Sequence, residues 1–269
     1  MSETAAGTRA AGAKGARPRR LRRGAAILPS LFTVGNLFLG FWSMIKAIHG
    51  EFEPASHLLF WAIVLDMLDG RIARLTGTTS EFGGELDSLA DVISFGVAPA
   101  LLAYQWAFPP IPRAGWLAAF LFVAAGALRL ARFNVQRHAS DGRFFVGLPI
   151  PAAAGQVAAL VAVLPGPLDE RPAAFGALAV VVILAFLMVS TFRYRSFKGV
   201  DLRARRSYAS ILGIAVALVV LFIEPAGVLV TLATGYALSG PAAYLYGLLR
   251  RKSGGPPAVV AETTPLQGL

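Results

Sequence analysis

The chain has 269 residues, of which 56% are hydrophobic and only 15% are charged, and its mean hydropathy is +0.62. This composition is typical of an integral membrane protein and excludes an ordinary soluble globule. The chain contains no cysteine, which excludes a disulfide framework, a thiol nucleophile and a thiolate metal site. Its three histidines are scattered along the chain, so a metal site built from histidines is not expected.

The N-terminal segment, residues 1–26, is rich in alanine, glycine and arginine. We expect it to be a basic, disordered tail that sets membrane topology and is attracted to anionic lipid headgroups. It shows no pattern of a cleaved leader. Residues 253–269 are expected to be a second disordered tail. Residues 27–252 are then one membrane domain.

Apolar segments of about 20 residues, long enough to cross a bilayer as helices, fill this domain. The predicted fold class is therefore all-α, an integral membrane bundle of about eight transmembrane helices. The expected spans are 28–49, 56–75, 84–107, 114–134, 148–165, 172–191, 207–224 and 226–249.

The distribution of basic residues predicts the orientation of these spans. If both termini are cytoplasmic, 22 of the 25 lysines and arginines fall on the cytoplasmic side, and only Lys46, Arg113 and Arg171 fall elsewhere. We therefore expect a multi-pass protein of the cell (inner) membrane. The net charge of +10 is accounted for by topology, and no nucleic-acid partner is expected.

Four aspartates, Asp66, Asp69, Asp87 and Asp91, lie between strongly apolar runs. A carboxylate at membrane depth costs about 2.5–3.5 kcal/mol, so four of them require a shared partner. Asp66 and Asp69 share one helix face, Asp87 and Asp91 share another, and a polar turn separates the two segments. Two antiparallel helices would aim all four carboxylates into one space.

Clustered carboxylates with no histidine or cysteine nearby indicate hard divalent cations as the partner. Mg²⁺ usually brings a substrate phosphate with it. Two such ions can hold the attacking and leaving oxygens of a phosphoryl transfer. We predict two divalent cations, Mg²⁺ or Mn²⁺, at a site that opens to the cytoplasmic face.

The same stretch reads D-x2-D-G-x2-A-R-x8-G-x3-D-x3-D, and in this pattern it resembles the CDP-alcohol phosphatidyltransferase family. The resemblance implies that Asp66, Asp69 and Asp87 bind the metal ions. It also implies that Asp91 belongs to the same carboxylate cluster and is the general base for the attacking hydroxyl. The pattern comprises Asp66, Asp69, Gly70, Ala73, Arg74, Gly83, Asp87 and Asp91.

The resemblance assigns Gly70, Ala73 and Arg74 to a pocket for the CDP-linked donor. Gly83 is a second position where the nucleotide or a facing helix approaches closely. Ser80 is a candidate CDP contact, with a turn-capping hydroxyl as the alternative. For Arg74 the alternative is an arginine that reaches the membrane interface.

The first span contains another candidate donor contact. Family members often show Pro-Asn followed by Thr in this region, whereas this chain has Pro29 and Ser30, then Thr33 and Asn36. Because Ser30 departs from the commonest family pattern, the resemblance does not assign a donor contact to position 30. Asn36 is predicted to face the site, and a plain interhelical hydrogen bond is the alternative.

Three further stretches, 127–136, 144–155 and 193–206, resemble the bacterial and archaeal phosphatidylserine synthases within that family. The resemblance covers roughly residues 28–206. It implies CDP-diacylglycerol and L-serine as substrates, phosphatidylserine and CMP as products, and a homodimer. Arg129, Arg132 and Asn134 are candidates to hold serine's carboxylate or a lipid phosphate. The alternative is that these arginines only set topology.

Two other functions remain open at this point. The same chemistry with glycerol phosphate or inositol phosphate as acceptor would require a denser basic pocket. A cation transporter would also place carboxylates in a membrane, but near its midplane, whereas these aspartates are predicted at one face.

Overall fold

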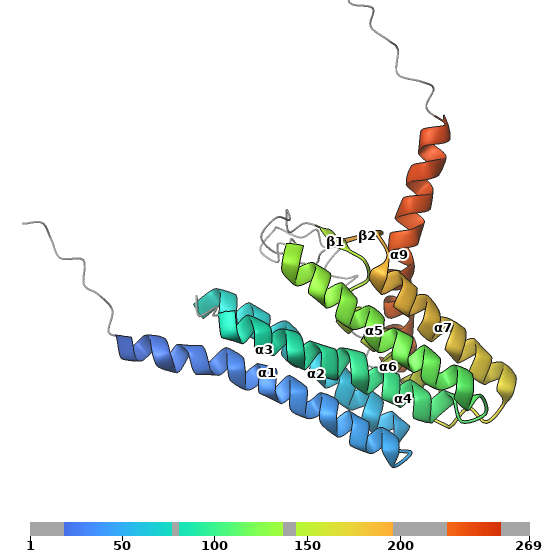
Figure 1. Ribbon diagram of the computed structural model, residues 1–269, viewed down its shortest axis with the longest axis horizontal. Coiled ribbons are helices and arrows are strands. Elements are labelled where there is room, and N and C mark those ends of the chain that lie inside the picture. The colour runs from blue at the N-terminus through green and yellow to red at the C-terminus, as the bar shows by residue number, and fades with distance from the viewer. Residues whose placement is uncertain (1–18, 77–80, 137–143, 196–224, 254–269) are drawn as a thin grey trace, which may run out of the picture.

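The structure is a computed structural model that describes residues 19–76, 81–136, 144–195 and 225–253. The regular elements among these residues are helices apart from two strands of three residues each, so the predicted helical architecture is confirmed and a small sheet is added to it (Figure 1). The elements are α1 (Arg19–Ile48), α2 (Phe52–Thr76), α3 (Glu81–Asp91), the π-helix η1 (Val92–Val97), α4 (Ala98–Ala107), α5 (Pro112–Gln136), β1 (Phe144–Val146), α6 (Ile150–Val163), α7 (Arg171–Val189), β2 (Arg193–Arg195) and α9 (Pro225–Ser253).

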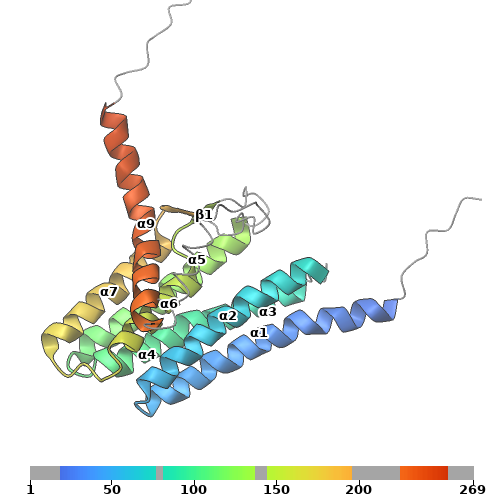
Figure 2. The ribbon, with the colours of Figure 1, turned by 180° about the vertical axis from the view of Figure 1, so that it is seen from behind.

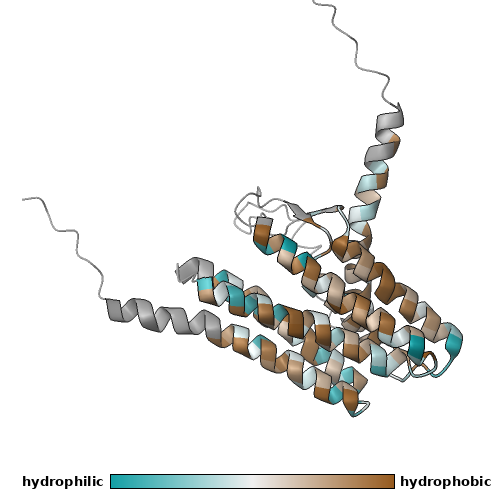
Figure 3. Ribbon diagram, in the orientation of Figure 1, coloured by the Kyte–Doolittle hydropathy of each residue, from teal (hydrophilic) through white to brown (hydrophobic). Residues whose placement is uncertain are grey.

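Five helical segments are long and apolar enough to cross a membrane, and hydrophobic residues cover most of their length (Figure 3). The apolar helix α6 is shorter. Helix α2 is not among the five, and it carries Asp66, Asp69 and Arg71 in its second half. The expected span 207–224 lies outside the described residues. The five segments are Leu31–Ile48, Glu81–Ala107, Pro112–Val135, Arg171–Val189 and Ala226–Tyr246.

The helix boundaries differ from the expected ones at the N-terminal end. Helix α1 begins at Arg19, inside the segment that we expected to be a tail. Arginine, leucine and alanine after Pro18 are strong helix formers, which favours this extension. The expectations for residues 1–18 and 254–269 lie outside the described residues.

Helices α1 and α2 form a hairpin that underlies the rest of the bundle (Figures 1 and 2). Gly50 makes the turn with a positive φ of 75°, a conformation that favours glycine. Lys46 and Glu51 form an ion pair of 2.5 Å across the turn. Ser43 Oγ donates a hydrogen bond of 2.8 Å to the Ala55 carbonyl oxygen, which joins the two helices inside the apolar region.

Small side chains allow the helices to pack closely, as is usual inside membranes. Alanines fill much of the buried core, whereas large apolar side chains such as Phe38, Trp61 and Phe120 are exposed on the outside. Large apolar side chains on the outer surface are favourable where that surface contacts lipid. At Gly40 on α1, an added Cβ would lie 2.5 Å from Ser94 Oγ, so only glycine lets α1 and η1 meet there.

The two strands lie at the end of the bundle where α5 ends and α7 ends. They pair antiparallel, with Phe145 opposite Tyr194. Gly147 follows β1 with a φ of 80°, and its N–H donates a 2.8 Å hydrogen bond to the Phe192 carbonyl. The sheet thereby joins the start of α6 to the end of α7.

Candidate active site

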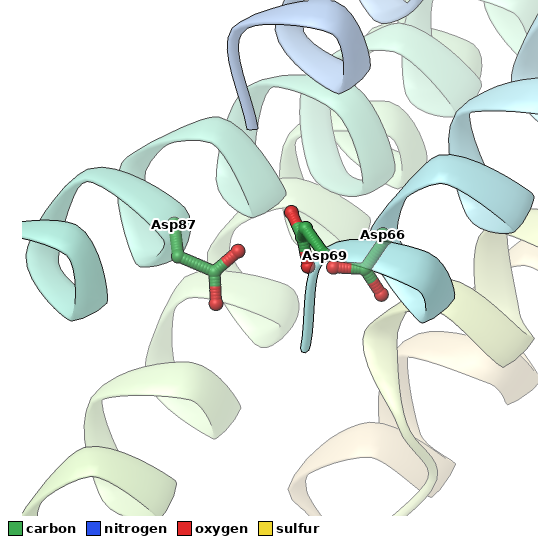
Figure 4. Close-up of side chains that lie close together, drawn as sticks. All are labelled: Asp66, Asp69 and Asp87. Atoms are coloured by element: carbon green, nitrogen blue, oxygen red, sulfur yellow. The ribbon is translucent and has the colours of Figure 1, made fainter. Parts of the chain in front are cut away.

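Three carboxylates converge between α2 and α3. Asp66 and Asp69 lie on α2 and Asp87 lies on α3, and one oxygen from each lies within 4.8 Å of the others. Figure 4 shows Asp87 pointing from α3 toward the two α2 aspartates. The predicted convergence of these three residues is therefore present in the folded chain.

Helix α1 packs against both α2 and α3, and this packing sets the spacing of the cluster. Thr33 on α1 donates a 3.3 Å hydrogen bond from Oγ1 to Asp69 Oδ2. Asp69 is buried, whereas Asp66 and Asp87 are half-buried. The cluster therefore has one side fixed by α1 and remains partly open on the other.

Asp91 ends α3 one turn beyond Asp87 and is only 9% exposed. Its carboxylate interacts electrostatically with those of Asp66, Asp69 and Asp87. Its Oδ1 atom is buried and has no hydrogen-bond partner among the described residues. Asp91 thus lies near the other three predicted aspartates, one turn further along α3 than Asp87.

The π-helix η1 begins directly after Asp91. A π-helix inserts an extra residue into a helical turn, and such insertions are frequent at functional sites. Ser94 in η1 donates a 3.1 Å hydrogen bond to the Asn36 carbonyl oxygen on α1. This contact holds the segment that follows Asp91 against α1.

Asn36 is fully buried, and neither its Oδ1 nor its Nδ2 has a hydrogen-bond partner in the described part of the chain. It lies one turn after Thr33, the residue that contacts Asp69. The interhelical hydrogen bond that was its alternative role is not formed by these side-chain atoms within the described residues. A buried amide without hydrogen-bond partners lowers the stability of the folded protein, and this favours a ligand contact for Asn36.

The predicted donor-pocket residues are only partly described. Gly70 is half-buried on α2 next to Asp69, and Gly83 lies in the first turn of α3. Ala73 and Arg74 belong to the last turns of α2, but their side chains lie outside the description. Ser80 lies outside the described residues, so its contact with CDP stays a prediction.

Arg129 on α5 is the buried cation of the site, with 7% of its surface exposed. Its guanidinium lies 5.4 Å from the centroid of the Phe133 ring, and its buried Nε has no hydrogen-bond partner among the residues that the structure describes. It interacts electrostatically with Asp91 without forming an ion pair with it. A positive group therefore lies within electrostatic range of the proposed base.

Arg132, the neighbour of Arg129 on the same helix face, has a different environment. Its guanidinium donates hydrogen bonds of 3.2 Å to Val189 O, 3.2 Å to Val146 O and 3.1 Å to Ser190 O. It therefore holds β1 and the carbonyl end of α7. Those bonds direct three of its five N–H donors to backbone carbonyl oxygens.

Asn134, the third candidate for the acceptor, contacts the aspartate helix. Its Nδ2 donates a 2.9 Å hydrogen bond to Ser88 Oγ, which itself donates to the Gly84 carbonyl oxygen at 2.9 Å. Ser88 lies next to Asp87 in sequence. Asn134 thus links α5 to α3 beside the carboxylate cluster.

Sequence reasoning gave no role at the site to two residues that contact it, Thr33 and Ser88. For Thr33 a signal was present, because a threonine three residues before Asn36 in an apolar span shares its face. Ser88 lies within a helix, and nothing in the sequence around it indicates its contact with Asn134.

The chemistry of the cluster fits divalent cations. Three carboxylates offer hard, anionic oxygen atoms at a spacing that one or two Mg²⁺ or Mn²⁺ ions can bridge. Without cations, so many carboxylates in one half-buried space would repel one another. Asp66, Asp69 and Asp87 are the residues able to hold such an ion.

Comparison with known proteins gives a consistent result. Residues 26–192 match the model of the CDP-alcohol phosphatidyltransferase family. The CDP-diacylglycerol–serine O-phosphatidyltransferase of Helicobacter pylori is 46% identical over 180 residues, which cover 65% of this chain and 74% of the relative. The enzyme of that name from Bacillus subtilis is 34% identical over 64% of this chain and 91% of its own length. The archaetidylserine synthase of Methanothermobacter thermautotrophicus is 39% identical over 64% of this chain and 71% of its own.

Proposed function

The chain belongs to the CDP-alcohol phosphatidyltransferase family, and from this premise we propose that it is a CDP-diacylglycerol–serine O-phosphatidyltransferase. The hydroxyl oxygen of L-serine attacks the phosphorus that carries the diacylglycerol. A new P–O bond forms to serine, the P–O bond to CMP breaks, and phosphatidylserine and CMP result. The observation that carries this proposal is the convergence of three aspartates beside a buried fourth.

Asp66, Asp69 and Asp87 are the ligands of the metal site, with Asp91 as a further carboxylate beside it. Two bound divalent cations, Mg²⁺ or Mn²⁺, would supply neutralisation of the charge on the donor's diphosphate and on the leaving CMP. Thr33 keeps Asp69 oriented through its hydrogen bond. Such outer contacts fix a ligand's rotamer and support its affinity for metal.

Asp91 takes the proton from serine's hydroxyl. The hydroxyl is a weak nucleophile until that proton leaves, and general-base assistance is typically worth about 10²–10⁴-fold in rate. The position of Asp91, one turn beyond Asp87, supports this role, as does its unpartnered Oδ1.

The donor pocket lies beside the metal ligands on α2 and α3. Gly70, Ala73 and Gly83 leave room for the nucleotide, while Arg74 and Ser80 contact the CDP moiety. Asn36 contributes its buried amide from α1. The family match and the unpartnered amide of Asn36 support these roles.

The acceptor enters from the α5 side. Arg129 meets the carboxylate of serine, and Asn134 with Ser88 lines the path beside Asp87. Arg132 supports this region by holding β1 and the end of α7 instead of binding the acceptor.

The membrane arrangement completes the proposal. One domain, residues 27–252, crosses the inner membrane eight times with both termini in the cytoplasm, so that soluble serine reaches the site from that side. The bias of 22 of 25 basic residues supports this orientation. The active form is a homodimer, as family resemblance implies.

An acceptor panel tests the function. Purified protein in lipid nanodiscs receives CDP-diacylglycerol and Mg²⁺ or Mn²⁺, and CMP release is measured with L-serine, glycerol phosphate, inositol phosphate or no acceptor. We expect release with L-serine and formation of phosphatidylserine. Release only with a phosphorylated alcohol would place the chain in the same family with another acceptor, and no release with any acceptor would contradict the proposal.

A further inference from the structure

Two arginines, Arg113 and Arg171, line the same hollow at the end of the bundle where α5 and α7 begin. The hollow has a volume of about 390 Å³. Arg113 is the second residue of α5 and Arg171 is the first residue of α7, and Figure 1 shows these two helix ends side by side. Both arginines are exposed. Two positive groups from two different helices therefore border one space.

The hollow lies far from the aspartate cluster along the bundle. On α5, Arg113 lies 21 positions before Asn134, whose side chain bonds to Ser88 beside Asp87. At about 1.5 Å per residue, a helix of this length spans about 32 Å. The hydrocarbon core of a bilayer is about 30 Å thick. The two arginines therefore lie at the membrane face opposite the aspartates.

Basic residues are rare on this face. If both termini are cytoplasmic, only Lys46, Arg113 and Arg171 of the 25 lysines and arginines lie there. Lys46 forms an ion pair with Glu51. Neither arginine has an ion pair within the described residues, although Asp169 and Glu170 directly precede Arg171. Because topology places most cations on the other face, two arginines without ion pairs at one hollow indicate a local role.

Hydrogen bonds hold both walls of the hollow. Trp106, in the last turn of α4, donates a 2.8 Å hydrogen bond from Nε1 to the Gly166 carbonyl oxygen. The Leu168 N–H donates a 2.9 Å hydrogen bond to the Trp106 carbonyl oxygen, which fixes the segment that leads into α7. On the other wall, the Ile111 N–H donates a 3.0 Å hydrogen bond to the Phe108 carbonyl oxygen just before α5 begins. The hollow is therefore formed in the folded chain before any ligand binds.

The rest of the lining is apolar. It includes Pro110, Ile111 and Phe175, and 53% of the surface of Phe175 is exposed. Trp116, one turn after Arg113 on α5, is also exposed. Aromatic side chains near the ends of spans are typical of the membrane interface. The hollow thus joins two positive groups to an apolar outer surface, which suits a molecule with an anionic head and apolar chains.

We propose that this hollow binds the phosphate of an anionic phospholipid in the leaflet opposite the active site. We call Arg113, Arg171 and Phe175 the distal lipid site. Guanidinium groups bind phosphate oxygens through paired hydrogen bonds, and the acyl chains lie along Phe175. A choline head group would bring a positive charge beside two arginines, so phosphatidylglycerol binds more tightly than phosphatidylcholine. The bound lipid joins the start of α5 to the start of α7.

Quenching of Trp116 by lipids with brominated acyl chains tests this site locally. The purified protein is placed in phosphatidylcholine nanodiscs that contain increasing fractions of brominated phosphatidylglycerol or brominated phosphatidylcholine. The signal of Trp116 is the difference between each protein and the same protein with Trp116→Phe. We expect phosphatidylglycerol to bind beside Trp116 about tenfold more tightly than phosphatidylcholine, the effect of hydrogen bonds to a charged group.

Three variants show which residues carry this preference. Arg113→Gln and Arg171→Gln each remove one charge from the hollow, and each should reduce the preference to about twofold or less. Lys46→Gln is the matched control, because it removes a charge from the same face outside the hollow, and it should keep the tenfold preference. Quenching by brominated phosphatidylcholine should be equal in all variants, which shows that the start of α5 remains folded in the bilayer.

Equal binding of the two lipids by the wild type would overturn the proposal. A preference that survives both arginine variants, or that Lys46→Gln lowers equally, would also overturn it, because the hollow would then not be the source. Inorganic phosphate at millimolar concentration should leave the brominated lipid bound, and full release would show a site for a soluble anion instead of a lipid. The absence of CMP release with serine would remove the proposed function and leave this proposal standing.

Discussion

Thr33 on α1 donates a 3.3 Å hydrogen bond to Asp69 on α2, 36 residues further along the chain. This bond connects the first span to the carboxylates that we propose as metal ligands. It orients the one aspartate of the three that is buried. Because a ligand's outer hydrogen bonds affect metal affinity, the relationship leads to a prediction.

Replacing Thr33 with valine keeps the volume of the side chain and removes the donor. We expect the Mg²⁺ or Mn²⁺ concentration for half-maximal activity to rise about tenfold, with activity recovered at high metal concentration. Thr231→Val, at an exposed site on α9, is the control and should behave as the wild type. An unchanged metal dependence in Thr33→Val would show that the bond does not support the site.

Replacing a proposed metal ligand should reduce activity more than Thr33→Val does. Each of Asp66→Asn, Asp69→Asn and Asp87→Asn replaces an anionic ligand with a neutral one, and we expect turnover to fall by at least about 10²-fold. EDTA should abolish wild-type activity, and added divalent cation should restore it. Wild-type turnover that persists in excess EDTA would contradict the metal site.

Asp91→Asn distinguishes a base from a ligand. The variant keeps the shape of the side chain and removes its basicity, so we expect CDP-diacylglycerol binding within several-fold of the wild type and a loss of turnover of at least about 10²-fold. Asp69→Asn should lose both binding and turnover. Calorimetry in nanodiscs measures binding, and CMP release measures turnover. Equally poor donor binding in the two variants would make Asp91 mainly a ligand, and near-normal turnover would place the base elsewhere.

Arg132 should matter for stability and not for serine binding. Arg132→Lys keeps the charge but cannot reach the three carbonyl oxygens of Val146, Val189 and Ser190 together. Loss of such bonds costs about 1.5–3 kcal/mol, so we expect the thermal midpoint, followed by tryptophan fluorescence, to fall by about 4 °C or more. KM for L-serine should change less than about twofold. A large rise in that KM with no loss of stability would return Arg132 to the acceptor site.

The orientation of the chain can be measured directly because the protein has no native cysteine. Single cysteines at Ala5 and Glu262 should resist an impermeant thiol reagent in intact cells and react after the membrane is opened. A cysteine at Gly166, between α6 and α7, should react in intact cells. Labelling at either terminal position in intact cells would overturn the eight-span arrangement.

The amino-acid sequence by itself determined the helical membrane architecture and the identity of the aspartate cluster. Both follow from local spacing: apolar runs of bilayer length indicate spans, and aspartates three or four residues apart share a helix face. That Asp66, Asp69 and Asp87 meet could be predicted because only a short turn separates their two helices. The exact ends of α1 and α6 were less predictable, since helix ends depend weakly on local composition.

Only the tertiary structure decided the roles of residues whose partners are distant in the chain. Arg129 and Arg132 share one helix face, but Arg129 is buried and interacts electrostatically with Asp91, whereas Arg132 binds the carbonyl oxygens at the end of α7. The hydrogen bond of Thr33 with Asp69 likewise depends on how whole helices pack. Periodicity shows which face of a helix a residue occupies, whereas the neighbour that this face meets is set by the packing of the entire bundle.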